Sequence, residues 1–595
     1  MQCSIKSVAA FLALIGVIGV AAACSENLLS SPAEGQTTPA RTEGPTEPSG
    51  PPEPMVAATV ERVLTNAEHP WLKWHEISDA APALRELYEN ESDRLFWFAG
   101  EVPYPAIEGA LSSLAGAGEH GLHSVDYDAD RLAEEWVLLG SGSVSAADRA
   151  LFDVALSVAV ARFLSAGHIG RVDPASLHWG YDVTPKSIDL ATTLKNVRNG
   201  GSVDAVLTDL EPPFPHYQRL RHAHEQFAAL AAAGEPDPVP ELPVSRPKVE
   251  PGDAWTGVPA LTARLTAFGD LASNDAAAGS GVAPDGTPLY GGALVDAVKR
   301  FQWRHGLEED GIIGKATLAA LNVSVADRLR QIELALERER WLPSMGEDPT
   351  IFVNVALFRL WATDPATGEE PLRMNVVVGK SLHHRTPIFI EQMEYAVLRP
   401  YWNVPYSIAV GETVPRARKD PSYIAAHDLE IVAGSSDDAR ALPPTPENLD
   451  KIVAGQLRVR QKPGPSNALG LAKFIFPNAE NVYMHGTPAQ QLFSRARRDF
   501  SHGCIRLENP AAFAEWVLRD KPEWTPERIK AAMNGERPTR VNLTESLRVV
   551  LFYVTVHVDS ENVVHFAEDI YGYDASLDAA LVHGYPYPTP KRAES

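Results

Sequence analysis

The stretch 485–506 decides the fold. It begins His-Gly-Thr-Pro at residues 485–488 and ends Ser-His-Gly-Cys-Ile-Arg at residues 501–506. Its Cys504 is one of three cysteines in the chain, and the other two lie within the first 24 residues. A thiol attacks a carbonyl only as the thiolate, and its ordinary pKa of about 8.5 leaves little of that form at neutral pH. A nearby imidazole can take the proton and hold the ion pair, so His485 and His502 favour a nucleophilic role for Cys504.

A cysteine beside a histidine also occurs as a small buried side chain or as part of a metal site. The longer pattern favours catalysis, because His485 followed by Ser-His-Gly-Cys at 501–504 resembles the signature of the L,D-transpeptidases, whose catalytic domain is of the YkuD type. The resemblance implies that Cys504 is the nucleophile, His485 the general base, and the carbonyl of Gly486 the group that fixes the imidazole tautomer. The family often has Asn two residues after the cysteine. This chain has Arg506 there, which puts the subfamily in question.

The other residues of the motif are expected to assist this chemistry. Ser501, His502 and Gly503 are assigned supporting roles, with His502 as the alternative general base. The N–H groups of Gly503 and Cys504 are expected to face the oxyanion. Arg506 either binds a substrate carboxylate through two nitrogens or pairs with an acidic neighbour.

Two aromatic residues are candidates for substrate binding. Tyr401 and Trp402 stand in Pro-Tyr-Trp-Asn-Val-Pro at 400–405, which resembles the approach to the site in the same family. They are also consistent with the simple packing of a corner. The adjacent histidines 383 and 384 are expected in a loop, and the predicted chemistry requires no metal and no cofactor.

Composition limits the class of protein. The chain has 595 residues, enough for three or four domains, since one core rarely grows past about 250 residues. Its net charge of −24 argues against a nucleic-acid partner, because a polyanion needs a basic surface. Three cysteines are too few for a disulfide framework.

The first residues are typical of a secretory signal. Lys6 precedes an apolar run at 8–20 and three alanines at 21–23. Residues 1–24 are therefore predicted to be a signal peptide, and Cys24 a lipidation site as in bacterial lipoproteins; ordinary cleavage after Ala23 is the alternative. The expected location is the periplasm of a bacterial envelope, lipid-anchored, at the outer membrane if the cell is Gram-negative. Residues 25–55 are rich in Pro, Gly, Ser and Thr and predict a disordered tether.

The middle of the chain is predicted to be helical. Residues 56–234 predict a helical domain that resembles the scaffold domain of large L,D-transpeptidases, and 235–257 a Pro-rich linker. Residues 258–323 resemble the three-helix peptidoglycan-binding repeat. A connecting helix is expected in 324–349, and its charge run 337–340 is interpreted as a solvated face with i,i+3 pairs.

From residue 350 apolar and polar residues alternate, which predicts short strands of a sandwich or open barrel. Residues 350–573 are assigned to a mainly β catalytic domain. The polar segment 411–470 is assigned to a helical insert, which the resemblance implies is a lid over the substrate. Residues 574–595 are expected to be a loosely ordered tail.

The predicted fold class is therefore multidomain α+β, of the large, YcbB-like class of L,D-transpeptidases. The resemblance implies that Cys504 attacks a tetrapeptide stem of peptidoglycan, releases D-Ala, and passes the acyl group to a side-chain amine of a second stem, giving a 3→3 cross-link. The expected partners are stem peptides, and a monomer is expected. The alternatives are a non-catalytic wall-anchoring lipoprotein and a cysteine carboxypeptidase that gives the acyl group to water.

Overall fold

The computed structural model describes residues 54–89, 95–142, 144–244, 246–275, 281–368, 370–381, 384–434 and 436–585. The predicted signal peptide with Cys24, the predicted tether as far as residue 53, and His383 lie outside these ranges.

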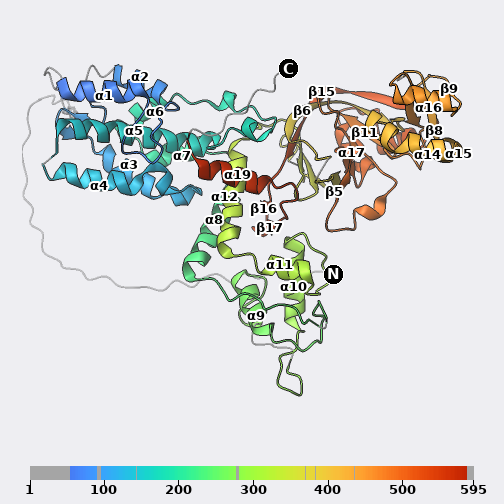
Figure 1. Ribbon diagram of the computed structural model, residues 1–595, viewed down its shortest axis with the longest axis horizontal. Coiled ribbons are helices and arrows are strands. Elements are labelled where there is room, and N and C mark those ends of the chain that lie inside the picture. The colour runs from blue at the N-terminus through green and yellow to red at the C-terminus, as the bar shows by residue number, and fades with distance from the viewer. Residues whose placement is uncertain are drawn as a thin grey trace, which may run out of the picture. The chain divides into compact units, whose positions relative to one another are not determined.

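The predicted helical domain is built around one long buried helix. Helix α5 (Ala146–Ile169) starts at a capping box in which Ser145 and Asp148 bond each other's backbone N–H groups. It packs against α1 (Pro54–Asn66), α3 (Ala106–Ala115), α4 (Ala129–Gly140), α6 (Leu190–Arg198) and α7 (Val203–Leu210), as Figure 1 shows. Helix α5 is long and apolar enough to cross a membrane, but 89% of its apolar window is buried inside the protein. It is therefore the core helix of this domain, with α2 (Ala81–Glu89) beside α1.

Two helices form a second, separate core. Helix α8 (Pro215–Ala233) packs on α12 (Val325–Arg340) and on the hairpin of β16 (Val556–Val558) and β17 (Val564–Phe566). Helix α8 lies within the predicted scaffold region 56–234, but its apolar face packs in this second core and not in the core of α5.

Helix α12 also corrects the interpretation of the charge run 337–340. These four residues are between 0% and 3% exposed, so they do not form a solvated face. Glu337 accepts hydrogen bonds from the backbone N–H groups of Arg171 and Val172. Arg338 pairs with Asp574, and Arg340 donates to the carbonyl of His120. The charges are buried because α12 lies between other elements, which local spacing does not reveal.

Residues 235–323 form one small packed unit. Helices α9 (Val258–Ala267), α10 (Ala293–Arg304) and α11 (Lys315–Leu321) share a core with Val239 and Val249 from the Pro-rich segment. Arg264, 1% exposed, donates to the carbonyls of Pro236 and Asp237. The segment 235–257 therefore packs against the three helices and is not a free linker.

The predicted catalytic region is a nine-stranded sheet in the order β13-β5-β14-β12-β11-β6-β15-β3-β4, and a further pairing of β4 with β5 closes it. The predicted β-rich structure is confirmed, with closure into a barrel. The strands are β3 (Thr350–Asn354), β4 (Arg359–Thr363), β5 (Leu372–Gly379), β6 (Phe389–Leu398), β11 (Ala472–Ile475), β12 (Met484–His485), β13 (Asp499–Ser501), β14 (Ile505–Leu507) and β15 (Thr539–Phe552). Helices α17 (Pro510–Val517) and α18 (Pro526–Met533) pack on it.

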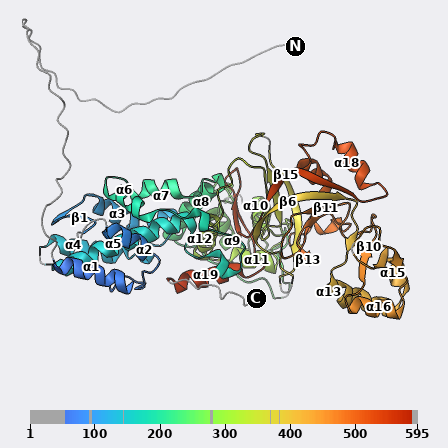
Figure 2. The ribbon, with the colours of Figure 1, turned by 90° about the horizontal axis from the view of Figure 1, so that it is seen from above.

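The predicted helical insert is larger and more mixed than expected. It holds a four-stranded sheet, β7-β10-β8-β9, made from β7 (Trp402–Asn403), β8 (Leu429–Val432), β9 (Ala441–Leu442) and β10 (Arg458–Gln461). Helices α13 (Tyr406–Ile408), α14 (Val414–Lys419), α15 (Ser422–Ala426) and α16 (Pro446–Val453) complete it, and a π-helical turn spans Ala409–Thr413. Figure 2 shows α13, α15, α16 and β10 as one group. The insert has its own apolar core, so it is a small α/β subdomain.

The chain after the barrel is ordered further than predicted. Helix α19 (Tyr573–His583) buries Leu577 and Leu581 in the barrel core. Its Asp574 pairs with Arg338, and its Asp578 pairs with Arg330 of α12. The expectation of a loosely ordered tail from residue 574 is therefore wrong for this helix.

Candidate active site

Strand register brings the predicted catalytic residues together. Strands β12 and β14 are parallel neighbours in which His485 lies opposite Arg506, and Ile505 N–H donates to the carbonyl of Tyr483. Alternate side chains of a strand point to the same face. Cys504 immediately precedes β14, so its side chain and that of Arg506 lie on one face, together with those of Tyr483 and His485. The predicted pairing of Cys504 with His485 is consistent with this register.

His485 is held in one tautomer. Its Nδ1 lies 2.5 Å from the carbonyl oxygen of Gly486, which can only accept, so Nδ1 carries the hydrogen and Nε2 is the free base. The imidazole is 6% exposed. Burial first, and then the charge of Arg506, lower the pKa of His485 to about 3. The imidazole is therefore neutral at physiological pH.

Cys504 is half-buried and carries no disulfide. Burial raises the pKa of its thiol above the usual value of 9.0, against the opposing effects of Tyr483 and Arg506. The expected thiolate–imidazolium pair is thus not the resting state. With the pKa of the thiol raised and that of His485 lowered, the resting pair is a thiol beside a neutral base.

Tyr483 is a site residue that the sequence analysis missed. Hydrogen bonds from its backbone and, to a smaller extent, from its hydroxyl lower the pKa of the Cys504 thiol, whose Sγ also lies 4.0 Å from the carbonyl oxygen of Asn481. Its ring lies 5.7 Å from that of His485, centroid to centroid. The sequence feature that could have identified Tyr483 is its position two residues before His485 in an extended segment, which places both side chains on the same face.

Ser501 and Gly503 shape the loop that presents the thiol. Ser501 Oγ donates to the carbonyl of Cys504 at 2.6 Å and accepts from the N–H of Gly503 at 3.2 Å. Gly503 has a φ of +113°, which L side chains rarely adopt, and its carbonyl accepts from Thr386 Oγ1 at 2.8 Å. Because the N–H of Gly503 is already bonded, the expectation that it faces an oxyanion is wrong. The N–H of Cys504 makes no hydrogen bond to a described residue.

His502 points to the insert and not to the thiol. Its Nε2 lies 3.7 Å from Glu412 in the π-helical turn, and its ring centroid lies 4.6 Å from that of His384. Burial, His384 and Lys380 lower the pKa of His502. These contacts fit the supporting role assigned to His502 and join the catalytic loop to the insert.

Arg506 is a cation without an acidic partner among the described residues, and its buried Nε makes no hydrogen bond. Burial lowers its pKa. Lys473, which the sequence analysis also missed, lies opposite His485 in the antiparallel pair of β11 and β12 and has its pKa lowered by burial. Of the two roles considered for Arg506, pairing with an acidic neighbour finds no support in the described part of the chain.

Tyr401 and Trp402 pack within the insert. The Arg460 guanidinium lies 4.3 Å from the centroid of the Tyr401 ring, and Trp402 is packed against the core of the insert. The corner-packing alternative is therefore present in the structure, and a role of these residues in substrate binding stays a prediction.

The insert returns to the barrel beside His485. Asn467 is fully buried and donates to the carbonyls of Pro400 and Lys462, which closes the base of the insert. Gly470 follows with a φ of +62°, and a Cβ placed on it would lie 2.5 Å from Thr487 N. The return segment therefore touches the backbone that holds the imidazole.

Comparisons with known proteins agree with this arrangement. Residues 348–538 match the family described as "L,D-transpeptidase catalytic domain", named YkuD. Residues 82–223 match "Scaffold domain", and residues 256–321 match "Putative peptidoglycan binding domain". A "Putative L,D-transpeptidase" of Haemophilus influenzae is 30% identical over 255 residues, which is 43% of this chain and 50% of that protein. The match thus spans about half the length of this curated relative. The chain carries an L,D-transpeptidase catalytic domain together with these two accessory domains.

Proposed function

We propose that this protein is an L,D-transpeptidase of the large, YcbB-like class that forms 3→3 cross-links between peptidoglycan stems. The observation that carries the proposal is the shared face of Tyr483, His485, Cys504 and Arg506, set by the register of β12 and β14 in a domain that matches this family.

The geometry supports a defined sequence of proton transfers. Nε2 of His485 takes the proton of the Cys504 thiol as the sulfur attacks the carbonyl of the third stem residue. The tetrahedral oxyanion is stabilised by the N–H of Cys504. The imidazolium then protonates the leaving D-Ala amine as the C–N bond breaks. In the second half, the neutral imidazole takes a proton from the acceptor amine, which attacks the thioester and restores the thiol.

The two cations on the site face support recognition of a charged substrate. Arg506 and Lys473 flank His485 in its neighbouring strands, and neither has an ion-pair partner among the described residues. Carboxylates of the donor stem are the groups that suit them. The insert acts as a lid, with the contact of Glu412 and His502 as its link to the catalytic loop. The module 256–321 binds the wall, and Cys24 anchors the chain to the envelope membrane.

The test is Cys504→Ala in the full chain with tetrapeptide muropeptides as substrate. The variant should keep its fold and lose both D-Ala release and 3→3 dimers, because the sulfur is the only atom removed. Intact-mass spectrometry should show a carbapenem adduct on the unaltered protein and none on the variant, as the family resemblance implies. Normal D-Ala release by Cys504→Ala would overturn the proposal. Product tripeptide without dimers, in the presence of an amine acceptor, would assign the site to hydrolysis.

A further inference from the structure

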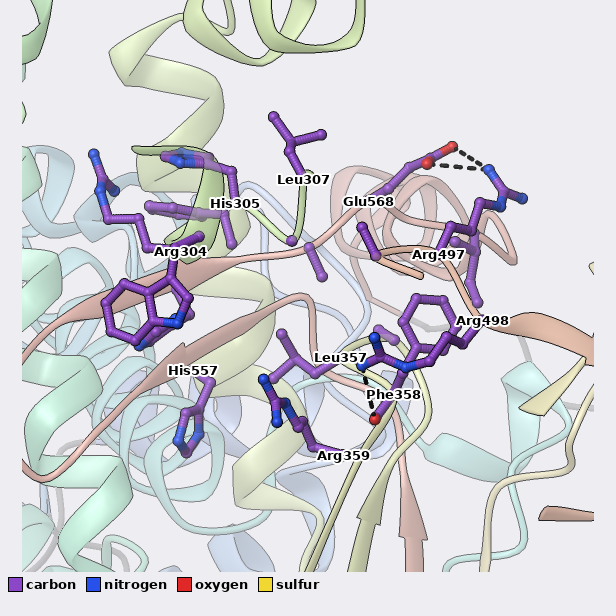
Figure 3. A pocket seen from close by; sticks show the side chains of 18 of the residues that line it. Arg304, His305, Leu307, Leu357, Phe358, Arg359, Arg497, Arg498, His557 and Glu568 are labelled. Carbon is purple, nitrogen blue, oxygen red and sulfur yellow. Dashed lines mark hydrogen bonds and ion pairs between the residues drawn. The ribbon is translucent and has the colours of Figure 1, made fainter. Parts of the chain in front are cut away.

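A cavity lies apart from the catalytic residues. Its volume is about 320 Å³, and its wall combines the end of α10, the start of β4, the loop before β13 and the hairpin of β16 and β17. Neither Cys504 nor His485 lines it. Figure 3 shows His305, Arg359, Arg498 and His557 around this space. A cavity of this size, between two folding units, is suited to a small ligand or to one end of a larger one.

Two arginines give the cavity an excess of positive charge. Arg498 is 7% exposed and donates only to neutral oxygens, namely the carbonyls of Val376, Arg495 and Phe358 and the side chain of Asn375. Arg359 is exposed, and its side chain makes no hydrogen bond or ion pair with any described residue. The charge of Arg359 acts on Arg498. Glu309 and Glu508 act on these arginines from a distance, but no described carboxylate forms an ion pair with either one. Two guanidinium groups that repel each other in this way make a site that an anion would stabilise.

The acidic residues of the wall do not cancel this charge. Glu568 is paired with Arg497 at 3.0 Å, and Asp559 with His565 at 3.0 Å. Glu309 also lines the cavity, and its charge acts on Arg359. The wall still holds more arginines than carboxylates, with Arg304, Arg359, Arg373, Arg497 and Arg498 against Glu309, Asp559 and Glu568.

Aromatic rings line the same space. Trp303 is 42% exposed and meets the ring of His565 edge-on, with centroids 4.6 Å apart. The centroid of Trp361 lies 5.1 Å from that of His557. The exposed ring of Trp303 and the half-buried rings of Trp361 and His557, beside a cationic wall, offer an apolar surface for the stem of a ligand whose charged end reaches the arginines.

We propose that this cavity is a binding site for a carboxylate-bearing peptide, with the carboxylate on Arg359, Arg498 behind it, and the peptide stem on Trp303 and Trp361. Recognition of a peptide carboxylate follows from the cavity alone. Its identification as the stem of a peptidoglycan strand rests on the function proposed above. The site would hold a strand against the seam of the peptidoglycan-binding domain and the barrel while Cys504 acts on another stem.

The experiment uses the full chain with Cys504→Ala, so that no peptide is consumed. Hydrogen–deuterium exchange of segments 356–361 and 496–498 is followed during titration with a tetrapeptide stem, with the same peptide amidated at its carboxylates, and with inorganic phosphate. Only the free-carboxylate peptide should protect both segments. Adding Arg359→Gln should weaken that protection at least tenfold in apparent Kd, whereas Arg62→Gln, an exposed arginine of α1 outside the cavity, should leave it unchanged.

Three outcomes would overturn this assignment: equal protection with Arg359→Gln, equal protection by the amidated peptide, or protection by phosphate at the same concentration as the peptide. Arg359→Gln in a chain that keeps Cys504 should still form the carbapenem adduct, because Arg359 does not touch the catalytic residues. Loss of the adduct in the unaltered chain would instead count against the proposed catalytic function, so the two failures are distinguishable.

Discussion

Gly470 gives the sharpest test of how the insert is tied to catalysis. The change is Gly470→Ala, which adds one methyl group. Gly470 has a φ of +62°, and the added Cβ would lie 2.5 Å from Thr487 N and 2.7 Å from the carbonyl carbon of Gly486. Both atoms belong to backbone, so no flexible side chain can move aside. The segment next to His485 must shift instead.

The expected loss in the free energy of unfolding has two parts. A non-glycine residue in the left-handed region costs about 1–3 kcal/mol. Overpacking against a fixed neighbour adds about 1–3 kcal/mol. For a domain of this size each kcal/mol lowers the Tm by about 2–4 °C, so a fall of about 4–24 °C is expected. Because Gly486 O fixes the imidazole, its displacement should slow acylation of Cys504 by about 10- to 100-fold.

The assay combines thermal unfolding with the rate of carbapenem adduct formation by intact-mass spectrometry. The matched control is Gly464→Ala, in the same return segment. Gly464 has no left-handed φ, and nothing lies within 4 Å of an added Cβ. The control should keep the Tm within about 1–2 °C and keep the rate, since surface changes usually alter the free energy of unfolding by less than ~0.5 kcal/mol. If Gly470→Ala matched the control in both measurements, the argument for a tight junction would be refuted.

Two further predictions concern the protons at the site. Because the pKa of His485 is lowered to about 3 and that of Cys504 is raised above 9.0, the pair holds one proton throughout pH 4–8. The acylation rate should therefore not change with pH in this range. In His485→Ala, where only free thiolate reacts, the rate should rise about tenfold per pH unit. A tenfold rise per pH unit in the unaltered protein would contradict a resting state of neutral thiol and neutral imidazole. Tyr483→Phe removes the donor to sulfur while it keeps the ring, so acylation should slow about 10- to 100-fold, with the Tm unchanged, since a hydrogen bond to a charged group contributes about 1.5–3 kcal/mol. An unchanged rate would remove Tyr483 from the site.

The sequence predicted the parts of the site that lie within one short motif. Cys504, His485 and the Gly486 carbonyl are close in sequence or carried by a recognisable spacing, and their positions are consistent with the structure. Lys473 was not predicted, because its place opposite His485 depends on the pairing of β11 with β12. The hydrogen bond from Tyr483 to the thiol likewise depends on the parallel register of β12 and β14, which no local pattern specifies.

The errors in the predicted fold also arise because burial depends on contacts between segments that are far apart in the sequence. The charge run 337–340 has the i,i+3 spacing of an exposed helix, but burial depends on what surrounds the helix. The proline-rich segment 235–257 has the composition of a linker, yet Val239 and Val249 are buried by a core that forms only when α9–α11 pack. The insert was expected to be helical because its strands are short, with only two residues in β7 and two in β9.

The burial of helix α12 limits which fragments of the protein can be produced with an intact core. Its Glu337 is bound by the N–H groups of residues 171–172, and its Arg330 and Arg338 are bound by carboxylates of α19, so three regions of the chain share one wall. A fragment of residues 348–538 would lack β15 (Thr539–Phe552), which pairs with β6 and β3 in the barrel, and it would lack the wall formed by α12. The smallest excised piece that keeps its own interior therefore starts upstream of α8 and runs through residue 583.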